Sequence, residues 1–318
     1  MKSRPSLKAF LSNLVDYAGL FPPANLSIND AIKNYSDYVN SDDSWMLGPF
    51  IQPVTKLNEL VKFRQLFTDK SPLLLSVVGR KSESNRECSL QLKEDIEQIR
   101  LYNETFSNWA KIDTYELPLP AVVPTQYLLN ELFDVTESIE LKVFCEVNIL
   151  SQTDWEEYLL KSLDSIAKFN LEHTSQLGVK LRTGGIKAEM IPSIDRIAFA
   201  ISACRDRHLP IKFTAGLHHP VRMFRNEVEA KMHGFLNVFL AGMLAYQHNL
   251  DQAKVKEILS EEDHNQFTIE DEYLAWKQYR ISSEEIAIYR KYLCSFGSCS
   301  FDEPKDELLE LSRQEVIK

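Results

Sequence analysis

The chain has 318 residues, of which 44% are apolar, and a net charge of −10. This length and composition allow a large buried core and favour one barrel-sized domain with additions over two smaller domains. The negative charge argues against a general nucleic-acid-binding protein, which needs clustered Lys and Arg, but it leaves room for a local basic pocket for a small anion. The five cysteines are odd in number and widely spaced, which predicts reduced thiols and not a disulfide framework. The sequence contains no apolar run long enough to predict a membrane-spanning helix. We therefore expect a cytoplasmic protein.

Short apolar runs alternate with helical patterns along most of the chain. We expect helices over residues 27–39, 55–67, 89–102, 125–132, 154–172 and 193–207. We expect strands over residues 15–21, 45–52, 73–79, 113–118, 142–148, 177–185, 210–219 and 233–240, the last of which is also compatible with a buried helix.

The spacing from strand to strand is about thirty residues, which is typical of parallel βαβ units. Eight such units predict the α/β class and a closed (β/α)8 TIM barrel. An open, doubly wound sheet is less favoured, because no G-x-G-x-x-G motif follows the first strand. We predict that residues 1–250 form the barrel. We predict that residues 251–318 form a C-terminal helical extension packed on it, with a helix over 283–293 and an acidic tail.

Two strands, 177–185 and 210–219, carry lysines between apolar residues. Lys180 alternates with Val179 and Leu181, and Lys212 alternates with Ile211 and Phe213. Because successive side chains of a strand point to opposite faces, both lysines are expected to point into the barrel from neighbouring strands. Two ammonium groups forced together lower the pKa of one of them, which is one way to obtain a nucleophilic amine.

The same alternation turns other polar side chains inward, at the strand ends where barrel enzymes hold their sites. The predicted cluster is Glu116, Glu146, Asn148, Lys180, Lys212, Thr214 and Asn237, with Arg182, Thr183, Gly184, Gly185, Gly216, His218, His219 and Arg222 in the adjoining loops. A structural ion pair between Lys180 and Glu146 is the alternative interpretation, because buried charges are often simply paired. Cys299 is a candidate reactive thiol that lacks an assigned histidine partner.

The two lysine-bearing strands and the loops that follow them resemble those of a known family. The segments VKLRTGG (179–185) and IKFTAGLHHPVR (211–222) resemble the deoxyribose-phosphate aldolase group of class I aldolases. That resemblance implies that Lys180 is a Schiff-base lysine, that Lys212 lowers its pKa, and that Gly216 and Arg222 lie at a phosphate end. We identify no counterpart of that group's aspartate on an early strand. The wider string of motifs also resembles a bacterial family of unassigned function.

The resulting hypothesis is an aldolase-like carbon–carbon lyase that acts on a small anionic carbonyl compound and needs no cofactor. Glu116 or Glu146 would move protons, Asn148 and Asn237 would orient hydroxyls, and Arg182 would hold the anionic group. One alternative is a metal-dependent hydrolase or lyase that uses His218 and His219 with the two glutamates. Another is a non-catalytic barrel that binds a ligand. We expect neither nucleic-acid nor membrane partners, and a homo-oligomer remains open.

Overall fold

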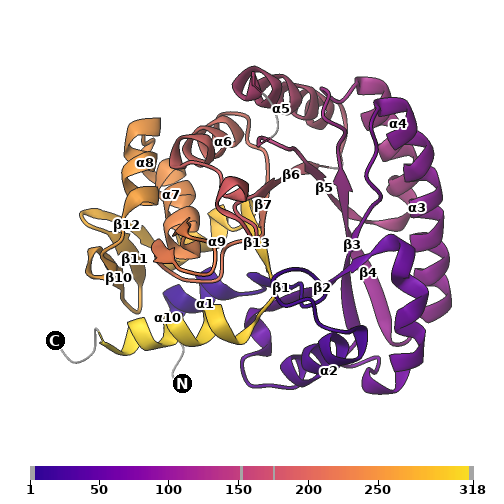
Figure 1. Ribbon diagram of the computed structural model, residues 1–318, viewed down its shortest axis with the longest axis horizontal. Coiled ribbons are helices and arrows are strands. Elements are labelled where there is room, and N and C mark those ends of the chain that lie inside the picture. The colour runs from indigo at the N-terminus through magenta and orange to yellow at the C-terminus, as the bar shows by residue number, and fades with distance from the viewer. Residues whose placement is uncertain (1–3, 151–152, 175, 315–318) are drawn as a thin grey trace.

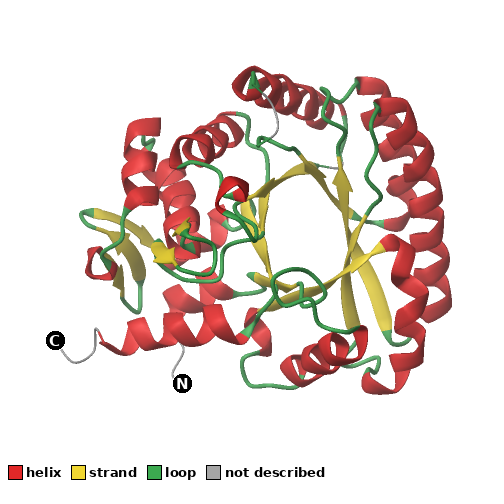
Figure 2. Ribbon diagram, in the orientation of Figure 1, coloured by secondary structure: helices red, strands yellow, loops and turns green. Residues whose placement is uncertain are grey.

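The computed structural model describes residues 4–150, 153–174 and 176–314. Within these residues, eight parallel strands form a closed barrel, seen almost end-on in Figures 1 and 2. The strands are β1 (Val15–Tyr17), β2 (Leu47–Pro53), β3 (Leu73–Val78), β4 (Ala110–Pro118), β5 (Lys142–Glu146), β6 (Leu177–Arg182), β7 (Ile211–Thr214) and β13 (Leu293–Ser298). They follow one another round the barrel in the order β1-β13-β7-β6-β5-β4-β3-β2, and β1 pairs with β2 to close it. The predicted TIM barrel is confirmed.

Helices form the outer layer around the strands (Figure 1). The α-helices are α1 (Pro5–Leu11), α2 (Ile28–Val39), α3 (Asn85–Phe106), α4 (Gln126–Thr136), α5 (Trp155–Glu172), α6 (Ile194–Asp206), α7 (Phe235–His248), α8 (Gln252–Ser260), α9 (Ser283–Tyr289) and α10 (Asp302–Gln314). Short 3-10 helices are η1 (Ser44–Met46), η2 (Val54–Leu66), η3 (Glu137–Ile139), η4 (Ala188–Met190) and η5 (His264–Gln266). The segment predicted as a helix over 55–67 is thus a 3-10 helix.

The expected eighth strand over 233–240 is wrong, because this segment begins helix α7. The residues from Phe235 to Ala245 are all buried and, apart from Asn237, lack polar side chains, so this part of the helix is buried on every side. A buried helix satisfies its own backbone hydrogen bonds, and an apolar run of this length exceeds an ordinary buried strand. Periodicity could not separate the two states, but the length of the run favoured the helix.

β13 is the strand that completes the barrel, between β1 and β7. Its sequence, Leu-Cys-Ser-Phe-Gly-Ser, is rich in small polar residues and therefore lacks the pattern of a buried strand. The predicted division at residue 250 does not coincide with the end of the barrel, because the chain returns to the barrel at Leu293. A helical C-terminal piece, α10, follows; its Leu308 and the preceding Phe301 pack into the core.

Residues between α8 and α9 form a small antiparallel sheet beside the barrel, at the left of Figure 1. Its strands are β10 (Phe267–Ile269), β11 (Tyr273–Trp276) and β12 (Tyr279–Ser282). A two-stranded hairpin, β8 (Met223–Arg225) with β9 (Ala230–Met232), follows β7. Among the described helices, none combines the length and the apolar character that crossing a membrane requires.

Strand parity places apolar side chains outward and charged ones inward on the two lysine-bearing strands. Val179 and Leu181 are completely buried in the core, while Lys180 lies between them on the opposite face. On β2, Gly48 leaves room for an inward side chain: a Cβ there would lie 1.9 Å from Oδ1 of Asp16. The absence of a side chain at position 48 thus allows Asp16 to occupy the barrel interior.

A chain that ends at residue 250 tests the role of β13. It lacks the strand that joins β1 to β7, so both would keep unpaired backbone groups. We expect this fragment to show no cooperative unfolding transition in circular dichroism. A chain that ends at residue 301, which retains β13 and lacks only α10, is the control and is expected to keep one. Cooperative unfolding of the shorter fragment would contradict the assignment.

Candidate active site

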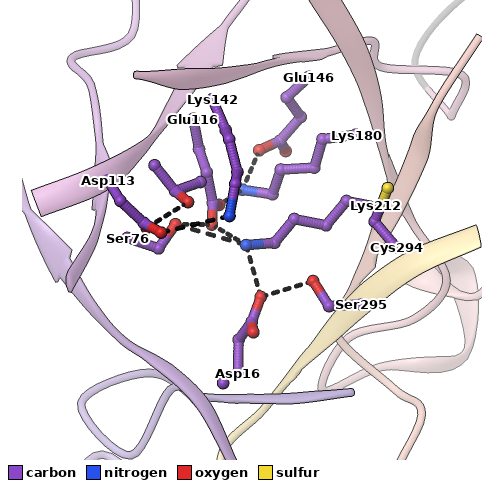
Figure 3. Close-up of polar contacts among 12 residues, drawn as sticks. Asp16, Ser76, Asp113, Glu116, Lys142, Glu146, Lys180, Lys212, Cys294 and Ser295 are labelled. Carbon is purple, nitrogen blue, oxygen red and sulfur yellow. Dashed lines mark hydrogen bonds and ion pairs between the residues drawn. The ribbon is translucent and has the colours of Figure 1, made fainter. Parts of the chain in front are cut away.

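Six charged side chains of alternating sign run through the barrel, and we call them the charge chain. They are Asp16, Lys212, Glu116, Lys180, Glu146 and Arg182, five of which appear in Figure 3. Three are acidic and three are basic, so their formal charges cancel. Charges in a barrel interior are costly unless each is paired, and alternation meets this requirement.

Glu116 on β4 bridges the two lysines. Its Oε2 lies 2.6 Å from Nζ of Lys180, and its Oε1 lies 2.5 Å from Nζ of Lys212. Oε1 also accepts a hydrogen bond of 2.6 Å from the hydroxyl of Ser76 on β3. The carboxylate is completely buried, so it separates two ammonium groups that would otherwise repel each other.

The two ends of the charge chain complete the pairing. Nζ of Lys180 lies 2.7 Å from Oε2 of Glu146, whose Oε1 is 3.9 Å from Nη1 of Arg182. At the other end, Nζ of Lys212 lies 2.6 Å from Oδ2 of Asp16. This oxygen also accepts a 2.8 Å hydrogen bond from Ser295 on β13. Every ammonium group of the charge chain therefore contacts two carboxylates.

Strand register explains why these side chains meet. Glu146, Lys180 and Lys212 are direct neighbours across β5, β6 and β7, so all three have the same inward parity. Glu116 on β4 pairs with Phe144, two residues before Glu146 on β5. The tilt of barrel strands thus brings a residue from a fourth strand between the two lysines.

The electrostatics of Lys180 reverse the sequence-based expectation. Burial alone would lower the pKa of Lys180, but the carboxylates of Glu116 and Glu146 raise it above its ordinary value. Lys212 behaves in the same way, since Asp16 and Glu116 overcome burial and raise its pKa. Burial opposes ionisation of Glu116, yet the two lysines hold its pKa far below the usual range. The prediction that Lys212 lowers the pKa of Lys180 is therefore wrong for this arrangement.

Two cavities border the charge chain from opposite ends of the barrel. The first, which we call the mouth cavity, lies at the C-terminal ends of the strands and has a volume of about 340 Å³. Lys180 lines it. The second, of about 570 Å³, lies at the N-terminal ends, and Lys212 lines it together with Asp16. The sequence led us to expect that the two amines are forced together, but they line different cavities because Glu116 lies between them.

The mouth cavity contains about half of the residues that the sequence singled out. The predicted residues on its wall are Glu116, Glu146, Lys180, Arg182, Gly185, Thr214 and His218. Apolar side chains such as Phe21, Ile51, Val78 and Met190 form much of the remaining wall. A concave, partly apolar cavity with a few convergent charged groups is the usual form of a small-molecule site.

The loops after β6 and β7 are joined to each other at the rim. Thr183 is buried and donates a hydrogen bond of 2.5 Å to the carbonyl of Ala215. Gly216 has φ +82°, and a Cβ there would lie 2.8 Å from the Cα of Gly184. Glycine at these positions is thus required by the contact between the loops. Gly184 and Gly216 therefore allow the two loops to pack together, whereas the sequence led us to expect them at the substrate.

Four other predicted residues lie off the wall of the mouth cavity. Asn148 is exposed and its Oδ1 accepts a hydrogen bond from Leu150 N at 3.0 Å. Asn237 belongs to α7 and is buried, where its amide contacts the backbone of Arg222, Ile258 and Glu261. The side chains of Arg222 and His219 line a separate surface cavity. The expected roles of these residues at the substrate do not agree with their positions.

Sequence reasoning missed Asp16, and it placed neither Lys81 nor the candidate thiol of Cys299 at the mouth cavity. Asp16 on β1 lies between Val15 and Tyr17, and it supplies an aspartate on an early strand. Alternation on that strand would have identified it. Lys81, in the loop after β3, and Cys299, after β13, both line the mouth cavity. Loop residues carry no periodic signal, so only the folded chain brings these two together.

Among the described residues, one group of three has the spacing of possible metal ligands: His219, Glu303 and Glu307, whose ligand atoms lie within 4.8 Å of one another. His219 Nδ1 lies 2.8 Å from both carboxylate oxygens of Glu307, and Glu303 contacts His218 at 3.4 Å. These contacts connect α10 to the loop after β7. Glu116 and Glu146 do not belong to this group, so it differs from the metal-ligand set considered from the sequence.

Comparison with known proteins gives distant structural similarity. A protein of Toxoplasma gondii ME49 described as a deoxyribose-phosphate aldolase has 11% identity and a TM-score of 0.41, over 98% of this chain and 97% of its own. A type I 3-dehydroquinate dehydratase of Clostridium difficile has 12% identity and a TM-score of 0.37, over 64% and 74%. An endoglucanase of Clostridium longisporum has 14% identity and a TM-score of 0.38, over 78% and 80%.

The first of these proteins is described by the name of the group that segments 179–185 and 211–222 resemble. No protein-family model and no curated protein matches the chain. The identities and TM-scores are too low to carry an activity over, so the site must be interpreted from its own residues.

Replacing Lys212 by Met tests its structural role. The substitution leaves Asp16 and Glu116 without their shared cation in a buried place, and we expect a loss of about 3–5 kcal/mol in the free energy of unfolding. Lys142→Met is the matched control, because Lys142 pairs with Asp113 at 3.3 Å but is 71% exposed. It should change stability little. Equal effects of the two substitutions in urea unfolding would contradict a buried structural pairing.

His218 gives a pH-dependent prediction. Burial opposes its charged form, but contacts with Cys299 and Glu303 raise its pKa from 6.5 to about 9. A group whose folded-state pKa is raised stabilises the fold below its unfolded-state pKa and loses that contribution as the pH rises through the folded-state value. The stability difference between the parent chain and His218→Gln should therefore be largest below pH 6.5 and decline toward pH 9. A difference that is constant with pH would contradict it.

Proposed function

We propose that the protein is a carbon–carbon lyase in which Lys180 forms a Schiff base with a small, anionic carbonyl compound. One observation supports this most: Lys180 lines a cavity at the C-terminal end of the barrel, and its Nζ lies 2.7 Å from Oε2 of Glu146. Amine and carboxylate are thus within proton-transfer distance beside a space that can hold a substrate.

The first step is transfer of a proton from the Lys180 ammonium to Glu146. The raised pKa of Lys180 means that the amine is charged in the free protein. A substrate that displaces water from the cavity lowers the local dielectric, which favours the neutral amine and carboxylic acid over the ion pair. An anionic group that pairs with Arg182 also weakens the hold of this guanidinium on Glu146, so the carboxylate becomes a better proton acceptor.

The neutral amine then adds to the carbonyl carbon, and the carbonyl oxygen takes the proton from Glu146. Glu146 next takes a proton from the substituted nitrogen and gives it to the new hydroxyl group, which leaves as water, so that the iminium forms and Glu146 is again a carboxylate. Cleavage moves the electron pair of the carbon–carbon bond into the iminium, while the Glu146 carboxylate accepts the proton of the departing β-hydroxyl. One carboxylate thus serves as acid and base in turn, and Glu116, buried between the lysines, holds the amine in place.

The cavity wall supports an anionic substrate. Lys81, Arg182 and His218 contribute three basic side chains to it, and the pKa of His218, about 9, keeps its ring charged at neutral pH. Opposed to them at the wall are Glu146 and Glu116, both already paired with Lys180. A carboxylate or phosphate group near the rim would therefore be attracted by these three basic side chains.

Borohydride trapping tests the proposal. The protein is incubated with borohydride and one of three carbonyl compounds: pyruvate, dihydroxyacetone phosphate or acetaldehyde. We expect a reduced adduct on the peptide that contains Lys180 with at least one of them, read as a mass increase. Lys180→Met should lose this adduct, and Lys142→Met, which changes an exposed lysine, should keep it. An intact protein without an adduct at Lys180 across an extended carbonyl panel would refute the Schiff base.

A further inference from the structure

A second pair of reactive side chains, Cys299 and His218, lines the mouth cavity together with Lys180. Cys299 follows β13 directly, and His218 lies in the loop after β7, so two adjacent strands deliver them to the same wall. Sγ of Cys299 lies 3.9 Å from Nδ1 of His218, within the range of a hydrogen bond to sulfur. The two side chains come from segments 81 residues apart in the sequence.

The histidine is held in place by two further groups. Its Nδ1 also lies 3.4 Å from the hydroxyl of Ser298 and 3.4 Å from Oε2 of Glu303 on α10. The His218 side chain is only 10% exposed, whereas Glu303 is 37% exposed. Contacts of Nδ1 with a thiol, a hydroxyl and a carboxylate fix the orientation of this imidazole ring. The thiol and the carboxylate also favour its protonated, positively charged form.

The other four cysteines lie in environments that suppress reactivity. Burial raises the pKa of Cys145 and of Cys204 to about 12 in each case, and it also raises that of Cys88. Cys294, on β13, has a pKa raised to about 11, mainly by burial, and its thiol donates to the carbonyl of Lys291 at 3.5 Å. Cys299 differs from all of them because it lines the mouth cavity and its thiol contacts the ring of His218.

We propose that Cys299 and His218 form a thiolate–imidazolium pair and that the thiolate is a second nucleophile of the mouth cavity, whose ligand is an aldehyde. The thiolate sulfur forms a bond to the aldehyde carbon. The carbonyl π electrons move to oxygen, and this oxygen takes the Nδ1 proton of His218. The product is a neutral hemithioacetal. The step is reversible, balances without another reactant, and does not require Lys180.

The surroundings fit this chemistry. An aldehyde is favoured over a ketone because its single substituent leaves the carbonyl carbon open to a sulfur atom in a cavity of about 340 Å³. Cations near the forming alkoxide stabilise it before the proton arrives. The titratable side chains that face the pair are Tyr17 from β1, Glu303 and Asp302 from α10, and Lys81, Glu146, Lys180 and Arg182 from the cavity wall. Burial is the main cause that raises the pKa of Tyr17, and Cys299 and Asp302 add to it.

Alkylation by iodoacetamide at pH 7 tests the thiolate. An unperturbed thiol is only about 3% ionised at this pH, so a paired thiolate should react about tenfold faster than a free small thiol. Trypsin leaves Cys294 and Cys299 in one peptide, because no Lys or Arg lies between residues 291 and 305. The measurement is therefore made in the Cys294→Ser background, with mass spectrometry of that peptide.

Two histidine variants separate the pair from a general effect of structure. His218→Gln should reduce the alkylation rate of Cys299 about tenfold, to that of a free thiol. His219→Gln, which changes the neighbouring ring that contacts Glu307, should leave the rate unchanged. If His218→Gln fails to fold, the ultraviolet absorption band of the thiolate, compared at pH 7 between the parent chain and Cys299→Ser, decides the question. A parent rate no higher than that of a free thiol, or no thiolate band, would overturn the proposal.

Protection by propanal tests the aldehyde ligand. In the Lys180→Met variant, which cannot form an imine at this position, propanal should slow alkylation of Cys299, and removal of the aldehyde should restore the rate. Acetone is the matched ketone and should give no protection. Fast alkylation that propanal does not slow would overturn the assignment of aldehydes as ligands. Because Lys180 is absent, this result does not depend on the Schiff base, and either proposal can fail alone.

Discussion

The need to pair every charge inside a closed barrel governs this structure. Six side chains from five strands place their charges in alternation, so removal of any inner member leaves a neighbouring charge uncompensated in the barrel interior. The lysines can be kept in the interior only because Asp16, Glu116 and Glu146 are also there. Gly48, which has no side chain to occupy the space of Asp16, is part of the same arrangement. Packing of the strands and pairing of the charges thus impose a single constraint on the sequence.

This constraint also shapes the chemistry that Lys180 can perform. A lysine beside another unpaired lysine becomes a free amine by repulsion, whereas Lys180 contacts two carboxylates and stays protonated until a proton is moved. The group that accepts the proton must then be one that the substrate can influence. Glu146 is such a group because its side chain is partly exposed and contacts Arg182, whereas Glu116 is completely buried and contacts both lysines. Reactivity in this barrel would depend on occupancy of the cavity.

The part of the fold and site that depends on local periodicity could be predicted from the sequence, and the part that depends on distant contacts could not. Alternation on β6 and β7 correctly turned Lys180 and Lys212 inward, and the thirty-residue spacing predicted the barrel. β13 was missed because small polar residues can occupy a strand when neighbouring strands cover it. The direction of the Lys180 pKa shift could not be predicted, because it depends on the carboxylate of Glu116 lying between the two amines. Strand tilt and register place Glu116 there. The contact between Cys299 and His218 could not be predicted either, because the two residues are 81 positions apart in the sequence and meet only in the folded barrel.

The contact between Gly184 and Gly216 has a consequence for how this barrel could change over evolution or in the laboratory. The hydrogen bond from Thr183 to Ala215 and the close approach of the two glycines couple the loops that follow β6 and β7. Arg182 precedes one of these loops and His218 belongs to the other, so a shift of one loop carries the other with it. Exchange of a single loop for that of another barrel would break the match. A new specificity would therefore have to be introduced by grafting both loops together as one unit.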